Sequence, residues 1–357
     1  MHVAVVGGGI AGLAAALELA DSGAPVTVLE GSGRFGGQIG TERRDGFIVE
    51  SGAEGFTARS EAVPELCRRT GLGADLIVQA RSRTLAWRDG RLVELENGAA
   101  AELLGIPVSE EDLGRGLRTL RGGMGDLIGA LVGSLERRAV LDTNSRVTAL
   151  RSEGAAWRVE RAGGTSLEVD GVVLAIPPGE AESLLAPLAG NAPLSGPIRF
   201  GSTVTVTLAY PRDAVTHALD ANGFVVDGPG PDGLRACTFS SSKFPDRAPA
   251  GWCLLRVFFT PEPGPIDPDV DRWSERAHRL LAPILGLTDR PRARWVSRWR
   301  AALPRYSPDH ARAVVAWRRQ LSRHGRLECA GAALDGGGID GAVRSGLTAA
   351  RRVAAPP

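Results

Sequence analysis

The stretch HVAVVGGGIAGLAAALELADSGAPVTVLE, residues 2–30, decides the fold. Residues 2–6 form the short apolar run of a buried strand, and residues 25–30 form a second one. Between them, residues 10–21 are rich in Ala and Leu and predict a helix. We therefore expect a βαβ unit with a right-handed crossover and a parallel sheet.

The glycines of this opening are spaced as Gly7-x-Gly9-x-x-Gly12, between the first strand and the helix. Gly7 permits a tight turn, Gly9 lets the backbone approach a pyrophosphate, and Gly12 lets the helix and strand pack closely. The N–H groups at the start of the helix would face the phosphate charge. Glu30 ends the second strand, where a carboxylate can accept hydrogen bonds from ribose hydroxyls. The pattern predicts a dinucleotide site of the Rossmann type.

A second loop distinguishes between dinucleotides. Arg34-Phe35-Gly36-Gly37 follows Glu30 by four residues. Its arginine can form charge-assisted hydrogen bonds, and its glycine pair lets the backbone crowd a cofactor. A nicotinamide dehydrogenase has no need of this clamp, so we expect FAD rather than NAD.

A third glycine-rich segment lies near the C-terminus, from Gly331 through Gly336-Gly337-Gly338-Ile339 to Gly346. It places glycines directly before a predicted helix, and so offers backbone amides and a helix N-terminus to an anionic ligand. Residues 326–350 are therefore expected to form a strand, a loop and a helix at the same cofactor.

The remaining chain alternates between helical and strand patterns. Asp89-Gly90 is a hairpin signal inside residues 82–95. The β-branched runs of residues 198–260 predict a mostly antiparallel sheet. Further expected elements are helices at 60–70 (with Ser60 as N-cap), 122–138 and 267–285, and strands at 139–150, 157–161 and 166–175.

Composition excludes several classes of function. With 357 residues and a formal net charge of +1, the chain has no basic excess for nucleic acid. The four cysteines form no CxxC pair and the five histidines have no zinc-ligand spacing, so we expect free thiols in a reducing cytoplasm and no metal. We find neither an apolar run of 18 residues nor a signal peptide, which favours a soluble cytoplasmic protein.

Three segments, VAVVGGGIAGLAAALEL, LEGSGRFGGQIGT and DGFIVESGAEGF, resemble the flavin amine oxidase superfamily. Four others resemble its protoporphyrinogen or coproporphyrinogen oxidase branch: TLRGGMGDLIGAL (119–131), FSSSKFPDRAP (239–249), WRAALPRY with His310 shortly after (299–310), and GAALDGGGIDGAVRSGLTAA (331–350). The matches extend from residue 2 to about residue 350.

This resemblance implies an α/β FAD-binding domain of Rossmann type and an inserted, mostly antiparallel substrate domain of α+β type. Matched positions give a discontinuous FAD-binding domain (1–70, 119–180 and 296–357) and a shortened substrate domain (71–118 and 181–295). The resemblance puts Gly52, Ala53 and Glu54 beside the isoalloxazine, Val147 at the adenine and Ala175 in the nucleotide pocket. The other implied FAD contacts are Gly7, Gly9, Ile10, Ala11, Gly12, Glu30, Arg34, Gly36, Gly37, Trp299, Gly331, Gly338, Ile339 and Val343.

One departure from the family pattern bears on the substrate. Family members carry a long helical region between the segments that match 82–95 and 119–131, and it builds much of the porphyrinogen pocket and of any membrane-binding surface. Only about 25 residues join these segments here. The flavin site can survive such a deletion, but a pocket for a tetrapyrrole and membrane attachment are not favoured.

The resemblance implies hydride transfer from a substrate carbon to flavin N5, followed by reoxidation by molecular oxygen to give peroxide. The flavin does this chemistry, so we nominate no catalytic side chain. Arg59, Arg81 and Arg83 are candidates to bind a substrate carboxylate, although surface arginines are common in this chain. FAD is expected to be non-covalent, because Cys329 lies in an apolar strand. Three functions remain open: a porphyrinogen-type oxidase, a dehydrogenase of a smaller nitrogenous or cyclic metabolite, and a flavin-binding scaffold without turnover.

Overall fold

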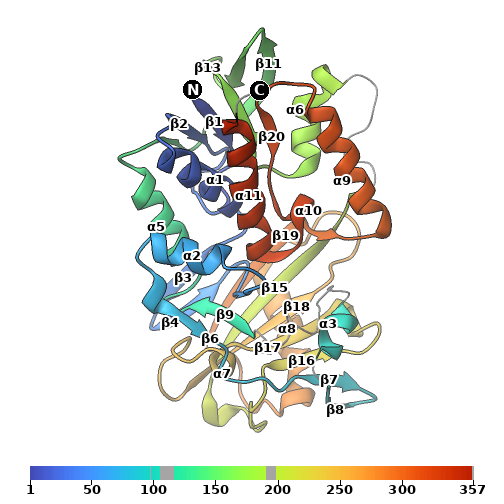
Figure 1. Ribbon diagram of the computed structural model, residues 1–357. Coiled ribbons are helices and arrows are strands. Elements are labelled where there is room, and N and C mark those ends of the chain that lie inside the picture. Colours follow the sequence, from blue (N-terminus) through green and yellow to red (C-terminus); the bar gives the residue numbers. More distant parts are fainter. Residues whose placement is uncertain (97, 105–115, 190–197, 356–357) are drawn as a thin grey trace.

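The computed structural model describes residues 1–96, 98–104, 116–189 and 198–355, and a five-stranded parallel sheet organises the upper part of Figure 1. The strand order is β10-β2-β1-β14-β20, with every neighbouring pair parallel. Its strands are β1 (Val3–Val6), β2 (Val26–Leu29), β10 (Val140–Asp142), β14 (Gly171–Leu174) and β20 (Leu327–Cys329).

Both faces of this sheet are covered, which explains why its strands are apolar throughout. Val3 and Val5 of β1 belong to the core formed with α1 (Ile10–Asp21), α5 (Gly125–Leu135) and α11 (Gly338–Ala354). The alternate residues Ala4 and Val6 face a second core. That core is closed by α6 (Pro178–Ala189), α9 (Pro308–Leu321) and a three-stranded sheet of β11 (Val147–Glu153), β12 (Ala156–Arg161) and β13 (Ser166–Val169).

A seven-stranded sheet forms the lower part of Figure 1, in the order β19-β15-β18-β17-β16-β7-β8. Neighbouring strands are antiparallel except for β16 and β7. Its strands are β7 (Leu85–Arg88), β8 (Arg91–Glu94), β15 (Arg199–Pro211), β16 (Gly223–Val226), β17 (Leu234–Phe239), β18 (Trp252–Phe259) and β19 (Ala293–Arg305).

The two faces of the seven-stranded sheet meet different partners. Helix α8 (Val270–Leu285) packs its buried face, including Trp273 and Leu281, on one side. On the other side, Trp295 and Leu254 pack against the hairpin of β3 (Thr41–Arg44) and β4 (Phe47–Glu50). The loop after β4 is therefore brought to the side of the sheet opposite α8.

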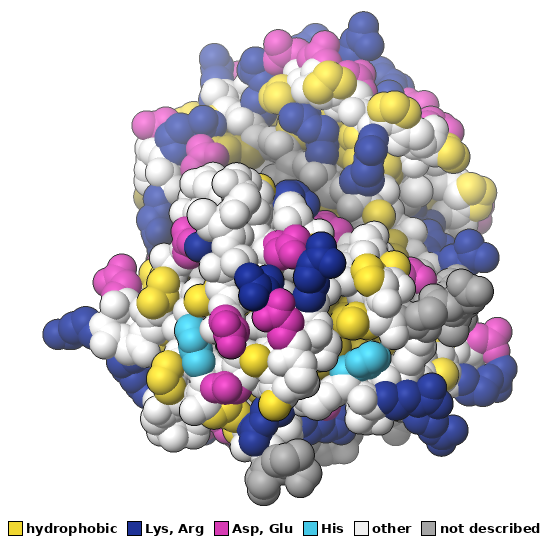
Figure 2. Space-filling model, turned by 90° about the horizontal axis from the view of Figure 1, so that it is seen from above, with side chains coloured by type: hydrophobic (Ala, Val, Ile, Leu, Met, Phe, Trp, Pro, Cys, Tyr) yellow, Lys and Arg dark blue, Asp and Glu magenta, His cyan; other side chains and the backbone are white. Residues whose placement is uncertain are grey.

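The remaining elements connect these layers. A small sheet in the order β5-β9-β6 consists of β5 (Phe56–Thr57), β9 (Leu117–Leu120) and β6 (Leu76–Val78). In the described part of the chain, the other α-helices are α2 (Ala62–Arg69), α3 (Ala99–Leu104), α7 (Ser240–Lys243) and α10 (Ala332–Asp335). Acidic and basic side chains are interspersed on the face of the molecule shown in Figure 2.

The predicted fold class is confirmed, and so are the βαβ opening and the turn at Asp89-Gly90, where φ is +50° and +77°. The strand predicted at 139–150 is wrong as one element. It is two strands in two sheets, β10 and β11, separated by Asn144 in a left-handed conformation (φ +55°), which Asn tolerates. The strand predicted at 166–175 likewise divides into β13 and β14.

Two boundaries also differ. Helix α2 starts at Ala62 with Glu61 at the N-cap, but the Ser60 hydroxyl still accepts a hydrogen bond from the Ala62 amide at 3.2 Å. Residue 296, the expected start of the third FAD-binding stretch, lies inside β19, which belongs to the seven-stranded sheet. The division into two domains stays a prediction.

Candidate FAD site

Close packing at the turn between β1 and α1 explains why two of its three motif positions, Gly7 and Gly12, must be glycine. Gly7 has φ +104°, and a Cβ there would lie 2.4 Å from the carbonyl oxygen of Ala175. A Cβ on Gly12 would lie 1.9 Å from the oxygen of Gly7, which is a close approach of helix and turn. A Cβ on Gly9 would meet only the Cα of Gly37, at 4.0 Å. Packing within the protein does not require glycine at position 9, whereas approach of a pyrophosphate does. The turn therefore fits a dinucleotide.

Glu30 stands at the end of β2 beside this turn. Its carboxylate accepts hydrogen bonds from the Gly8 amide at 2.8 Å and from the Ser32 amide at 2.7 Å. These bonds hold a negative charge at the edge of the site, where the sequence places the acceptor for ribose hydroxyls.

The Arg34 loop lies directly against the glycine turn. The Gly36 amide donates to the oxygen of Gly8 at 2.8 Å, and the Arg34 guanidinium donates to the oxygens of Ile39 and Gly37 at 2.9 and 2.8 Å. The Arg34 side chain thus stabilises the loop to which it belongs. A Cβ on Gly36 (φ +112°) would lie 2.7 Å from the oxygen of Ile39, so this bend requires glycine.

The third glycine segment approaches the same turn through α11. A Cβ on Gly346 would lie 2.1 Å from the oxygen of Ala11, so α11 crosses α1 at backbone contact. Gly331 (φ +144°) and Gly338 (φ +78°) have no atom within 4 Å of an added Cβ, which leaves open space on that side. Ile339 and Val343 are buried in the core that also contains Ile10 and Ala11.

Two aromatic side chains contact α10, the short helix that precedes α11. The Tyr306 hydroxyl donates to the oxygen of Ala332 at 2.7 Å, and His310 Nε2 lies 2.6 Å from the oxygen of Ala333. Because a carbonyl only accepts, this nitrogen of His310 carries the proton. Burial raises the pKa of Tyr306 to about 12, so the phenol remains a donor at neutral pH. Sequence analysis singled out the segment containing both residues but did not predict this contact.

The loop after β4 carries Gly52, Ala53 and Glu54 to the face of the seven-stranded sheet opposite α8. The Trp299 indole N–H donates to the oxygen of Ser51 at 2.8 Å, and Arg256 donates to the oxygen of Gly52. A Cβ on Gly52 would lie 1.6 Å from the oxygen of Gln38. Trp299 and this loop are therefore brought together. Their position at the flavin stays a prediction.

Glu54 of this loop lies within a set of largely buried charges, and sequence analysis did not predict the other members: Glu50, Lys243, Arg247 and Arg256. We call this set the buried charged cluster. Four of these side chains, together with Ser240 and Thr207, line a small cavity. The SSKFPDR stretch supplies Lys243 and Arg247, and the DGFIVESGAEGF stretch supplies Glu50 and Glu54.

Glu54 is kept ionised by its neighbours in this cluster. Burial alone would raise the pKa of its carboxyl, but Lys243 and Arg256 outweigh burial and lower it to about 2. Its oxygens accept hydrogen bonds from the Ser240 hydroxyl at 2.7 Å and from Lys243 Nζ at 3.1 Å. Burial raises the pKa of Glu50, despite bonds from Thr41 and the Met124 amide at 2.7 and 2.8 Å.

Val147 and Ala175 lie at the ends of strands near the nucleotide turn. Val147 begins β11 opposite Arg161, and Arg161 pairs with Asp142 at 2.7 Å. Ala175 follows β14, and its amide donates to the oxygen of Val6 at 2.7 Å.

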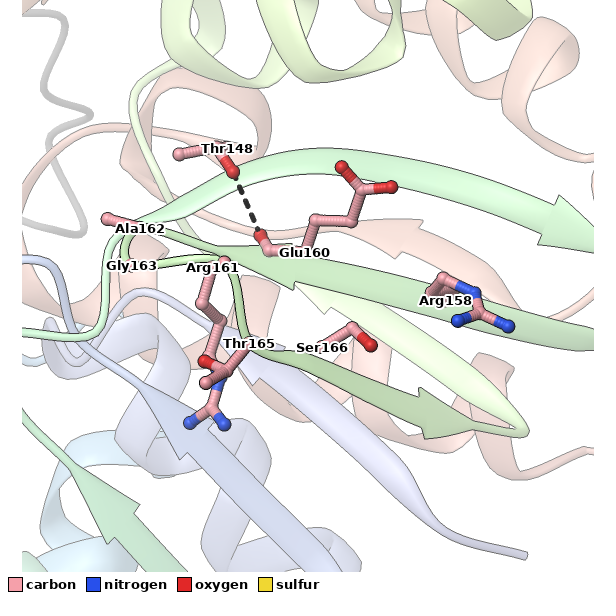
Figure 3. A pocket seen from close by; sticks show the side chains of 9 residues that line it. Thr148, Arg158, Glu160, Arg161, Ala162, Gly163, Thr165 and Ser166 are labelled. Atoms are coloured by element: carbon pink, nitrogen blue, oxygen red, sulfur yellow. Dashed lines mark hydrogen bonds between the residues drawn. The ribbon is translucent and has the colours of Figure 1, made fainter.

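Figure 3 shows a pocket beside β12, lined by Thr148, Arg158, Glu160, Arg161, Ala162, Gly163, Gly164, Thr165 and Ser166. Arg158 is paired with Glu153 at 2.6 Å, and Thr148 donates to the oxygen of Glu160. We find no arrangement for catalysis in this pocket.

The three arginines suggested for substrate binding are not alike. Arg83 is paired with Asp220 at 2.6 Å and with Glu94 at 3.0 Å. Arg59 is close enough to Tyr306 to oppose the rise in its pKa. Arg81 is exposed and follows Ala80, whose amide donates to the oxygen of Lys243 at 2.8 Å. Their role in substrate binding stays a prediction.

All four cysteines are buried free thiols. Burial raises the pKa of Cys329, so it is a poor nucleophile at neutral pH. Within the described ranges, no group of three His, Cys, Asp or Glu side chains could hold a metal ion. In the same ranges, no helix is long and apolar enough to cross a membrane.

The fold and the site define a flavin-dependent oxidoreductase. The chain belongs to the family of flavin containing amine oxidoreductases, whose model matches residues 10–110 and 108–354. It is 27% identical to a coproporphyrinogen III oxidase of Propionibacterium freudenreichii, over 95% of this chain and 88% of that one. It is 22% identical to that of Bacillus subtilis, over 98% and 97%.

Among solved structures, the chain resembles a protein assigned as a protoporphyrinogen oxidase from Exiguobacterium sp. 255-15. The TM-score is 0.83 at 23% identity, with 98% of each chain covered. Cyclohexylamine oxidase from Brevibacterium oxydans matches with a TM-score of 0.73 at 16% identity, over 99% and 98%. The resemblance drawn from the sequence motifs is thus confirmed.

The comparisons also bear on the shortened region. The alignment with the P. freudenreichii enzyme spans 468 positions, whereas this chain has 357 residues, so more than a hundred positions of that alignment have no residue here. The family match divides at residues 108–110, inside the linker that the sequence marks as shortened. Residues 105–115 lie outside the described part of the chain.

Proposed function

We propose that this FAD-dependent oxidoreductase oxidises a porphyrinogen, with coproporphyrinogen III as the first candidate and molecular oxygen as the acceptor. The observation that carries the proposal is the alignment with coproporphyrinogen III oxidases over 95–98% of the chain. Family membership alone would equally accommodate an amine substrate, since cyclohexylamine oxidase has the same fold.

FAD, when bound, would supply the hydride acceptor, and the protein would bind and orient the reactants. The Gly9 opening and the amides at the start of α1 would hold the pyrophosphate, with Glu30 at the ribose. Gly52 and Trp299 would pack at the ring system, held in place by their bonds to Arg256 and Ser51. Conversion of coproporphyrinogen to coproporphyrin releases six electrons and six protons, which would reduce three oxygen molecules to three of hydrogen peroxide.

We further propose that FAD is held without a covalent bond and that the protein works in the cytoplasm. The buried thiols support both points, because a thiol of raised pKa such as Cys329 would not attack the flavin, and free thiols suit a reducing compartment. Acid precipitation should leave the flavin in the supernatant. A yellow pellet would contradict non-covalent binding.

The test of the substrate is aerobic turnover of coproporphyrinogen III and protoporphyrinogen by flavin-loaded protein, followed by porphyrin fluorescence. We expect porphyrin to form well above autoxidation, with three peroxides per porphyrin. Fluorescence that stays at the level of a heat-inactivated control, with FAD bound, would overturn the proposal.

A second candidate is oxidation of a smaller nitrogenous or cyclic metabolite. It is favoured by the alignment positions that have no residue here and by the break at residues 108–110, because the region lost in such a deletion builds much of a tetrapyrrole pocket in related proteins. Anaerobic bleaching of the bound flavin by a primary or cyclic amine, but by neither porphyrinogen, would select this alternative. Rapid porphyrin formation would exclude it.

A further inference from the structure

The buried charged cluster contains more positive than negative charge. Lys243, Arg247 and Arg256 have side chains that are at most 13% exposed, and the cluster sets two carboxylates, Glu50 and Glu54, against them. Asp126 acts on Arg247 as a third carboxylate from outside the cluster. Burial raises the pKa of Glu50. A buried charge without a partner costs several kcal/mol, so this excess calls for an explanation.

Within the cluster, Arg256 is the least compensated cation. Lys243 has Glu54 at 3.1 Å, and Arg247 has Glu50 at 3.6 Å together with the Thr119 hydroxyl at 2.9 Å. Arg256 instead donates to the backbone oxygen of Gly52. Its Nε, like that of Arg247, has no hydrogen-bond partner among the described residues. Burial lowers the pKa of its guanidinium, although the two carboxylates act on it from a distance. The Arg256 guanidinium therefore places its positive charge against the 52–54 loop.

We propose that Arg256 and Lys243 form a cationic support behind the 52–54 loop that raises the reduction potential of the bound flavin. The inference rests on the proposed position of Gly52, Ala53 and Glu54 beside the isoalloxazine. Reduction adds electrons to the ring system, and a fixed positive charge in a site of low dielectric stabilises the more negative state. The oxidised ring system would be neutral, so this positive charge would favour the reduced form of the cofactor specifically.

The test is the equilibrium reduction potential of the bound flavin, measured without substrate against a reference dye. Arg256→Met and Lys243→Met should each lower the equilibrium constant for two-electron reduction about tenfold, a shift of about −30 mV. Arg256→Lys keeps the charge and should recover most of the shift. If Arg256→Met does not fold, Lys243→Met remains available, because the Lys243 side chain is 13% exposed and so is less deeply buried than that of Arg256.

The matched control is Arg272→Met on α8, across the same sheet, where the side chain is 76% exposed and pairs with Asp267. It should leave the potential unchanged. Potentials of Arg256→Met and Lys243→Met equal to that of the control would overturn this inference and leave the proposed function intact. Failure of the unmodified protein to bind FAD would overturn both.

Discussion

At Gly12 the structure leaves no room for a side chain. A methyl group there would lie 1.9 Å from the oxygen of Gly7, whereas ordinary van der Waals contact begins at 3.4 Å, so α1 and the turn would have to separate by about 1.5 Å. Overpacking typically costs about 1–3 kcal/mol, and a backbone oxygen cannot rotate away. We expect Gly12→Ala to lower the free energy of unfolding of the apoprotein by about 3 kcal/mol.

The same displacement moves the amides that would hold the pyrophosphate. A loss of about 3 kcal/mol in binding corresponds to about a hundredfold weaker affinity for FAD, measured by quenching of flavin fluorescence. The control is Gly129→Ala on the exposed face of α5, where an added Cβ meets nothing within 4 Å, and it should stabilise the protein by about 0.5–1 kcal/mol. If Gly12→Ala unfolds at the same urea concentration as the parent and binds FAD equally well, the close approach of α1 to the turn is wrong.

Three further predictions concern the cofactor site. The pKa of Glu54 is about 2 in the folded protein against an ordinary 4.5, so its contribution to stability is present above pH 4.5 and is lost as the pH falls through about 2. Glu54→Gln should remove about 3 kcal/mol of this pH dependence, seen as a flatter plot of unfolding free energy against pH. An equally steep plot for the variant would show that Glu54 is not its source. Tyr306→Phe removes one hydrogen bond to Ala332 and should weaken FAD binding about fivefold, with the circular dichroism spectrum unchanged. An affinity equal to that of the parent would mean that the Tyr306–Ala332 hydrogen bond does not set the position of the third glycine segment. Glu30→Ala leaves two amides without their charged acceptor and should weaken FAD binding at least tenfold, with Glu30→Gln in between; equal titration curves would contradict the role given to this carboxylate.

The sequence predicted those parts of the site that depend on local backbone chemistry. Gly7 and Gly12 permit the tight turn and the close approach of helix α1, and Gly9 leaves room for a pyrophosphate. Glu30 follows at the end of the next strand. The Arg34 loop meets the same turn, since it follows β2 within a few residues. These features can be predicted because residues close in sequence form them.

The buried charged cluster could not be predicted in this way. Glu50 ends β4 and Arg256 lies in β18, and they meet only because the β3–β4 hairpin covers the seven-stranded sheet. In a strand pattern, an arginine such as Arg256 indicates a solvent-exposed face, whereas here it is 3% exposed. The division of residues 139–150 between two sheets escaped prediction for a related reason, because both halves are strands and only tertiary pairing separates them.

The central claim is that the flavin on this fold takes electrons from a porphyrinogen. The most direct measurement is anaerobic mixing of the FAD-loaded protein with coproporphyrinogen III, followed through the visible absorption of the flavin. We predict that the flavin band bleaches as porphyrin appears, and that it returns when oxygen is admitted. A band that persists with coproporphyrinogen III and protoporphyrinogen, yet bleaches with dithionite, would contradict the account.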